Sequence, residues 1–187
     1  VEFNTNASAT TVTRVPDLLA ATQFADAVAT YAPGRVDSLL GQNTNWFDQI
    51  DRTGYGQEYD LALTNGSDNM GYRLSLGYQK QNGIIRASSV DRLSLGINYE
   101  QSLFNDRLDL STNVRGARSI DKFTPGDVLG NAVGMAPTQP VLNPSSATGY
   151  WDWNTTNASP SNPVASLVLA SDQGTTWRSV GNISAAY

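Results

Sequence analysis

The 187-residue sequence contains neither cysteine nor histidine. Without cysteine the chain has no disulfide bond and no thiolate metal site, which fits a reducing compartment or a bacterial envelope protein that does without bridges. Without histidine it lacks both the commonest general base and the commonest metal ligand. We therefore expect no metal site and no other cofactor.

Basic residues and long apolar runs are also scarce. The 12 lysines and arginines are outnumbered by 17 acidic residues, giving a net charge of -5, so nucleic acid is not expected as a partner. The sequence has no run of 18 apolar residues, which excludes a membrane-spanning helix but not a membrane strand. It begins at Val1 without an initiator methionine or a signal-like segment, and we expect a processed or incomplete piece.

Strict alternation of apolar and polar residues dominates the stretch from Met70 to Arg118. Three consecutive segments there each place apolar residues on one face and charged, amide, hydroxyl or glycine residues on the other, as β-strands do. The neighbouring sequence adds weaker examples, and the predicted strands lie near residues 1–12, 57–65, 70–80, 92–103, 107–118 and 176–187. These segments predict an all-β fold, an antiparallel up-and-down meander.

The connections at one end of the predicted sheet are short, and those at the other end are long. Tight turns at 65–69 and 104–107 fall at one end, whereas the long connections 13–56, 80–91 and 119–175 fall at the other. This sorting is typical of a large transmembrane β-barrel with long external loops, and a soluble sandwich has no reason for it.

The long connections differ in expected content. In the first of them we expect a short helix, opened by Pro16, capped by Asp17 and stopped by Pro33-Gly34. The last, 119–175, is rich in Gly, Pro, Asn and Ser, and we expect a structureless loop that is functional or disordered.

Aromatic residues bracket the apolar faces as the interfacial girdles of a membrane barrel do. The predicted lipid-facing girdle consists of Tyr72, Tyr78, Tyr99, Trp177 and Tyr187. Six steps from Tyr72 to Tyr78 span ~20 Å of strand, or ~15 Å of membrane depth after tilting. Since the apolar band of such barrels is ~25 Å tall, Met70 or the far end of the strand must extend it.

Several short motifs occur in a fixed order along the chain. They are Asn43-Thr44-Asn45-Trp46, Gly71 to Tyr78 followed by Gln81-Asn82-Gly83-Ile84-Ile85, Asp91 to Leu95, Met135 to Val141, and Asn162-Pro163-Val164-Ala165. Together and in this order, they resemble the SusC/RagA family of TonB-dependent outer-membrane transporters across nearly the whole chain.

The resemblance implies that residues 1–187 are the first six strands of a roughly 22-stranded barrel that follows a plug domain. The plug, the N-terminal energy-coupling box and the remaining strands are absent from this sequence. Six strands cannot close, so we expect missing chain or other subunits to pair with strands one and six. A closed or two-layered body with a dry apolar core between sheets would contradict the barrel.

The resemblance also implies a location, a function and partners. The location is the bacterial outer membrane, and the function is import of oligosaccharides or peptides without a reaction on the substrate. The implied partners are the rest of the barrel and its plug, a SusD-like surface lipoprotein that lids the barrel, outer-membrane lipid, and the TonB complex through the absent N-terminal region.

Two groups of residues are candidates for contact with a transported substrate. The lumen-facing charged residues are predicted to line the passage, or to pair with each other or with the plug; they are Arg73, Arg92, Asp109, Arg115 and Arg118. In the longest loop, Tyr150-Trp151-Asp152-Trp153 could stack on sugars and bond their hydroxyls. Alternatively these rings anchor the loop on itself or on the lid protein, or lie at the membrane interface.

Other functions stay open at this point. One is a secreted, soluble, β-rich carbohydrate-binding module that uses Trp151 and Trp153, and another is a structural component of an envelope assembly. An enzyme is not expected: four carboxylates lie in or beside one loop, but their spacing fixes no catalytic pair; they are Asp121, Asp127, Asp152 and Asp172.

Overall fold

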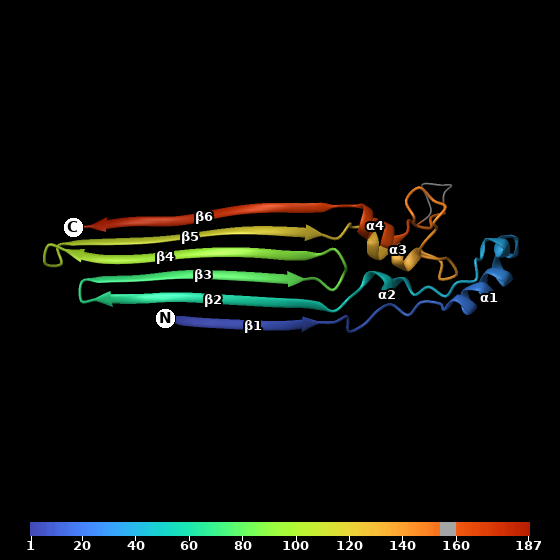
Figure 1. Ribbon diagram of the computed structural model, residues 1–187, viewed down its shortest axis with the longest axis horizontal. Helices are drawn as coiled ribbons and strands as arrows, with labels where there is room; N and C mark the ends of the chain where they lie inside the picture. Colours follow the sequence, from blue (N-terminus) through green and yellow to red (C-terminus); the bar gives the residue numbers. More distant parts are fainter. Residues whose placement is uncertain (154–159) are drawn as a thin grey trace.

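The structure, a computed structural model, describes residues 1–153 and 160–187. Six strands form one antiparallel sheet in the order β1-β2-β3-β4-β5-β6 (Figure 1). They are β1 Glu2–Thr10, β2 Gly54–Ser67, β3 Met70–Asn82, β4 Ser89–Leu103, β5 Leu108–Phe123 and β6 Asp172–Ala186. Because each strand pairs with the next along the chain, the predicted all-β up-and-down meander is confirmed.

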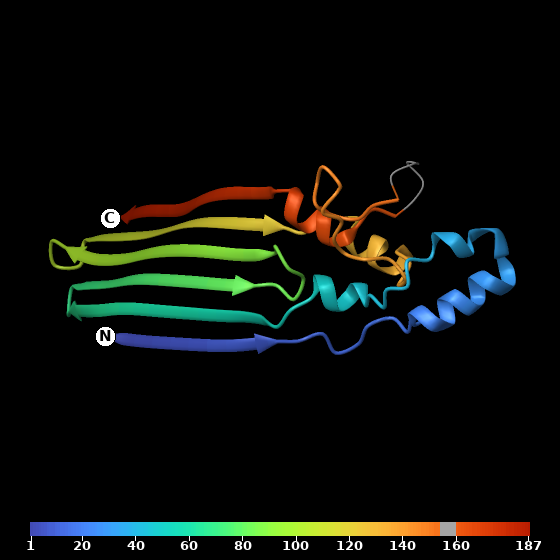
Figure 2. The same cartoon turned by 45° about the vertical axis from the view of Figure 1, so that its right-hand side comes forward.

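All helices lie beyond one end of the sheet, which we call the loop end, and the two tight turns lie at the other, the turn end (Figures 1 and 2). The helices are α1 Ala21–Tyr31, the 3₁₀ helix η1 Pro33–Ser38, α2 Trp46–Ile50, α3 Val128–Gly134 and α4 Pro163–Leu169. None of the helices in the described part of the chain has the length and apolar composition that crossing a membrane requires.

Within residues 1–153 and 160–187 the sheet is a single layer with no second layer packed on it (Figure 2). Of the buried hydrophobic residues among those described, only Ala62 belongs to a strand, and the largest cluster lies in the helices at the loop end. The apolar residues of the sheet are exposed, with Leu95 at 57% and Ile97 at 46% of their full surface. The dry core between sheets that would have contradicted a barrel wall is therefore not present in the described residues.

Strands β2 to β6 continue further than the alternation of the sequence indicated, whereas β1, Glu2–Thr10, is shorter than the predicted 1–12. Residues 65–67, predicted as a turn, pair with β3, which leaves only residues 68–69 between the strands. At the loop end the predicted connection 80–91 shrinks to residues 83–88, because Lys80 pairs with Asp91 and Gln81 with Val90. The backbone hydrogen bonds of the ladder continue where both faces have become polar, so the apolar pattern ends before the strand does.

The helical content of the loops also differs from the prediction. Helix α1 begins at Ala21 rather than near Pro16, and the Gln23 side chain, not Asp17, bonds the amide at its start, accepting from the Ala20 N–H at 2.9 Å. Helix α1 ends at Tyr31, before Pro33-Gly34 as predicted, and the chain continues from Pro33 as the separate 3₁₀ helix η1.

The predicted loop 119–175 is shorter and more ordered than expected. Strand β5 reaches Phe123, β6 starts at Asp172, and α3 and α4 occupy parts of the segment between them. Residues 154–159 of this loop lie outside the described residues. The order comes from contacts with the first long connection, which polar loop composition does not reveal.

Candidate functional site

The register of the sheet gives it one apolar face and one polar face, because directly paired residues of antiparallel strands point to the same side. One row of the apolar face places Leu63, Leu74, Ile97 and Val114 side by side across four strands. The neighbouring row toward the loop end includes Leu61, Leu76 and Leu95. So wide an exposed apolar surface is typical of contact with a partner or a lipid phase.

Aromatic rows border this apolar face on both sides. Toward the turn end Tyr72 pairs with Tyr99, and toward the loop end Tyr59 pairs with Tyr78, their rings 6.5 Å apart at 16°. Trp177 lies in the second row, and Tyr187 follows the last residue of β6 at the turn end.

The apolar face reaches beyond the row of Tyr72. There Met70 and Leu110 both pair with Gln101, and this row lies two residues farther along the strands than the row of Tyr72. This row supplies part of the required extension, since eight steps from Met70 to Tyr78 span ~26 Å of strand, or ~20 Å of depth after tilting, against a band of ~25 Å.

The polar face carries four of the five charged residues predicted for the lumen. The Arg73 guanidinium pairs with the Glu2 carboxylate at 2.9 Å, and Asp109 accepts a hydrogen bond from the Ser102 hydroxyl at 2.7 Å. Arg92 and Arg115 are exposed on this face, and their side chains have no hydrogen bond or ion pair within the described residues.

A hollow of about 610 Å³ lies in the middle of the polar face. Arg92, Arg115 and Arg178 border it on the side of β4 to β6, and Glu58 and Asp60 border it on β2. Between the two charged sides, the hollow is lined by small residues that leave it open: Ser75, Gly77, Ser94 and Gly96. The analysis of the sequence missed Arg178, Glu58 and Asp60 as site residues, although the same alternation places them on this face.

Arg118 is a correction, since it lies on the apolar face and not on the predicted lumen-facing one. It pairs in register with Leu93 on β4 and with Trp177 on β6. Its guanidinium carbon is 5.3 Å from the centre of the Trp177 ring, a cation–π contact. The prediction followed the charge of the side chain, whereas Arg118 is four residues after Val114 and so shares its face.

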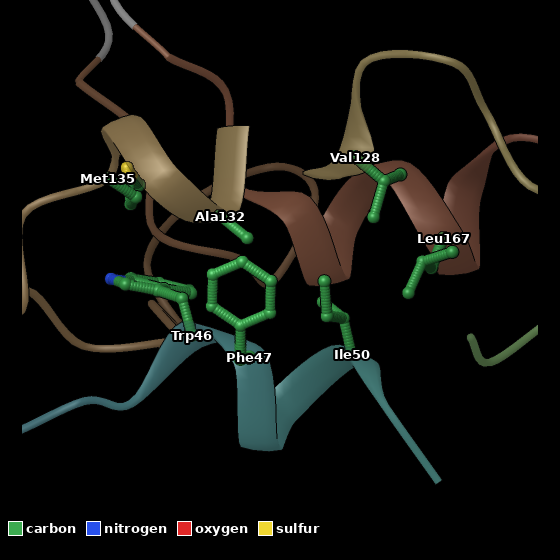
Figure 3. Close-up of a cluster of buried hydrophobic side chains, with 7 residues drawn as sticks. All are labelled: Trp46, Phe47, Ile50, Val128, Ala132, Met135 and Leu167. Atoms are coloured by element: carbon green, nitrogen blue, oxygen red, sulfur yellow. The ribbon is translucent and has the colours of Figure 1, made fainter. Parts of the chain in front are cut away.

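At the loop end, helices α2, α3 and α4 pack into a small core, which we call the loop-end cap (Figure 3). Its buried side chains are Trp46, Phe47, Ile50, Val128, Ala132, Met135 and Leu167. The Trp46 indole N–H donates to the Ala136 carbonyl oxygen at 3.0 Å, which fastens α2 to a segment 90 residues away. The cap thus joins the connection before β2 to the one before β6.

Several of the motifs that carry the family resemblance meet in this cap, whereas Gly71 to Tyr78 and Asp91 to Leu95 lie in β3 and β4. Asn45 caps α2, its side-chain oxygen accepting from the Phe47 N–H at 3.1 Å. Ile85 of the β3–β4 connection packs against the core. Arg52 fastens the same connection by donating to the Gly83 and Ser88 carbonyls at 3.0 and 2.8 Å. Sequence order alone could not show that these separate pieces form one structure.

Asn162 is the polar centre of the cap and is 1% exposed. Its side-chain oxygen accepts from the Val164 and Ala165 amides at the start of α4, at 3.0 and 3.2 Å. Its side-chain nitrogen donates to the Val141 and Trp151 carbonyls, at 2.8 and 2.9 Å. The side chain of this one asparagine therefore caps a helix and links two loop segments. These roles require one acceptor oxygen and two N–H donors, and an asparagine amide has both.

The predicted substrate-contact segment lies against the cap. Trp151 and Trp153 meet edge to face with ring centres 4.8 Å apart, and both are partly buried against its core. The Trp151 amide donates to the Val141 carbonyl at 3.1 Å. Tyr150 is partly buried and Asp152 exposed. Packing on the loop itself, the alternative considered above, accounts for these contacts, and substrate contact stays a prediction.

The six-stranded sheet is similar in fold to solved transporter structures. It superposes on the structure of the RagAB peptide transporter with a TM-score of 0.66 over 87% of this chain and 23% of that chain, at 16% identity. The RagAB peptide importer in its 'open-open' state gives a TM-score of 0.62 with the same coverage. The fold is therefore that of a segment of a transporter β-barrel wall.

The sequence is also similar to curated TonB-dependent receptors, which are outer-membrane proteins. It is 31% identical to TonB-dependent receptor SusC of Bacteroides thetaiotaomicron over 164 residues, 78% of this chain and 16% of the receptor. It is 29% identical to TonB-dependent receptor P3 of Formosa agariphila over all of this chain and 19% of that receptor. The chain belongs to the SusC/RagA family of TonB-dependent transporters, as a segment of the barrel.

The chain thus spans less than a fifth of the length of these two receptors. No family model matches it. The relatives are receptors and transporters rather than enzymes, in agreement with the expectation from the sequence.

Proposed function

We propose that the chain forms part of the wall of an outer-membrane barrel that imports oligosaccharides or peptides together with a SusD-like lipoprotein. The observation that supports this most strongly is the two-faced single sheet, whose apolar face is fully open while its connections sort by length to opposite ends. The similarity to SusC and to the RagAB fold points the same way. No bond of the substrate is made or broken. The barrel lets selected substrates pass, with energy supplied through TonB.

In this proposal each face has its own solvent. The apolar face contacts lipid, with Tyr72, Tyr99 and Tyr187 at one interface and Tyr78 and Trp177 at the other. The polar face contacts the lumen, where exposed charges remain hydrated or meet the plug. Unpaired guanidinium groups such as those of Arg92 and Arg115 are tolerated in a wet lumen but are costly in lipid.

The loop end is the external side in this proposal, and strands β1 and β6 pair with further strands of the same barrel. The loop-end cap then presents a rigid surface to the lid lipoprotein. Beside the cap, the partly buried Tyr150 and the exposed Asp152 are accessible for contact with substrate. An ordered cap places such contacts better than a structureless loop does, because less entropy is lost on binding.

Uptake by the whole protein tests this function. In the bacterium that encodes it, we expect energised uptake of one class of labelled oligosaccharide or peptide to disappear when the gene is deleted and to return on complementation. Uptake is also expected to disappear without TonB. The whole protein should require detergent for extraction and should copurify with a surface lipoprotein.

The secreted carbohydrate-binding module gives the opposite results. It would be extracted without detergent, as a monomer, and deletion would leave uptake unchanged. A detergent-requiring protein whose uptake survives loss of TonB would also contradict the proposal, because passage would then be passive.

A further inference from the structure

Arg118 occupies an unusual position for a charged residue. It lies on the apolar face, in the aromatic row nearest the loop end, and is exposed. Its aromatic partner is Trp177, which is itself 74% exposed. Among the described residues the Arg118 guanidinium makes neither a hydrogen bond nor an ion pair, so its five donors are available to a ligand.

Beside Arg118 the apolar face contains a groove of about 430 Å³. Residues of three adjacent strands line it on this face: Leu93, Leu95, Gly116, Arg118, Trp177 and Ser179. Gly116 is its floor, where an added Cβ would meet only the Arg178 carbonyl oxygen, at 4.0 Å. Because β5 is paired on both sides within the chain, the groove lies inside the sheet and not at its open edge.

The groove has the shape and chemistry of a lipid site. Its walls, on β4 and β6, are two strand spacings apart, ~9.6 Å. Its body is apolar, and at the loop end it opens at the Arg118 guanidinium, with Lys122 four residues farther along β5 on the same face. A guanidinium binds phosphate with paired, charge-assisted hydrogen bonds.

We propose that this groove binds one membrane lipid, with an acyl chain over Gly116 and a headgroup phosphate on Arg118. The occupant is a lipid because the apolar groove and the cation are continuous, so that free phosphate would use only half of the site. The inference rests on the proposed function, in which this face contacts lipid. In that setting Trp177 holds the guanidinium at the level of the headgroups, and the arginine aliphatic stem remains along the apolar surface.

Native mass spectrometry of the whole protein, released from detergent micelles, tests the proposal. The probes are dioleoyl phosphatidic acid, dioleoylglycerol with the same chains but no phosphate, and inorganic phosphate. We expect the wild-type protein to retain one phosphatidic acid, dioleoylglycerol to bind ~10-fold more weakly, and inorganic phosphate not to displace the lipid.

Two variants divide the site into its parts, each with a matched control. Arg118→Gln is expected to raise the apparent Kd for phosphatidic acid ~10-fold, whereas Arg178→Gln, on the opposite face of the neighbouring strand, leaves it unchanged. Gly116→Leu fills the groove and is expected to abolish retention of the lipid with the arginine intact. Gly71→Leu is its control, since an added Cβ there meets nothing within 4 Å.

Several results would overturn the lipid site. They are equal effects of the two arginine variants, retention of lipid by Gly116→Leu, displacement of the lipid by inorganic phosphate, or a protein dimer that covers the face without lipid. In each case an intact, detergent-requiring transporter that supports uptake shows that the proposed function stands and the lipid site alone has failed. A protein extracted without detergent would overturn both.

Discussion

Replacing Trp46 by alanine is expected to unfold the loop-end cap while leaving the sheet intact. Trp46 is 3% exposed in the core that joins α2, α3 and α4. Truncating a buried tryptophan removes apolar contacts and leaves a cavity, at a cost of ~3–5 kcal/mol. It also leaves the Ala136 carbonyl without its indole donor.

Hydrogen–deuterium exchange of the whole protein measures this effect. A loss of ~3–5 kcal/mol corresponds to exchange at least ~100-fold faster in peptides from α2, α3 and α4. Peptides from β3 and β4 are expected to keep their protection, because in the described part of the chain helices α2, α3 and α4 contact one another and not the strands.

Leu129→Ala is the matched control for the cap. Leu129 is on α3 beside the buried Val128 but is 50% exposed, so its loss is expected to change exchange little. If Trp46→Ala and Leu129→Ala accelerated exchange equally, the cap would not be held by the core described. If Trp46→Ala also released β3 and β4, the cap and the sheet would be one cooperative unit.

Replacing Leu95 by arginine is expected to impair folding of the whole protein into a bilayer, whereas replacing its neighbour Ser94 is not. Leu95 lies on the apolar face between the two aromatic rows, and Ser94 lies on the polar face beside the hollow. Arginine on the lipid face of a barrel costs ~2–4 kcal/mol near the membrane midplane. On the lumenal side the guanidinium remains hydrated.

The measurement is urea unfolding of the whole protein from phospholipid vesicles, compared for the two variants and the wild type. The free energy of unfolding is expected to fall by ~2–4 kcal/mol for Leu95→Arg and to change little for Ser94→Arg. Ser94 donates to the Gly77 carbonyl at 3.3 Å, a weak contact whose loss is small. An equal loss in the free energy of unfolding for the two variants would mean that lipid and water do not contact different faces of the sheet.

Local pattern was sufficient to predict the sheet and its two faces, because side chains of a strand alternate with a period of two. The same reasoning failed at the strand ends. There Lys80 pairs with Asp91 on a ladder whose side chains no longer alternate in polarity. It also failed for Arg118, which was assigned to the lumen by its charge although its position in the alternation gives the apolar face.

The loop-end cap could not be predicted from local pattern, since its contacts join segments about 90 residues apart, as between Trp46 and Ala136. One local signal was available. Val128, Ala132 and Met135 follow one another at four and three residues, the spacing of one helix face. The buried role of Asn162 had no such signal, because an asparagine before Pro163 predicts only a helix start.

Spin labels along one strand would test most directly whether the sheet separates lipid from a wet lumen. The labels replace Arg73, Leu74, Ser75 and Leu76 of β3 one at a time in the whole protein, reconstituted in bilayers. We expect labels at 74 and 76 to collide with oxygen dissolved in the lipid, and labels at 73 and 75 to collide with a water-soluble nickel reagent. Loss of this alternation, or water access on both faces, would contradict a barrel wall.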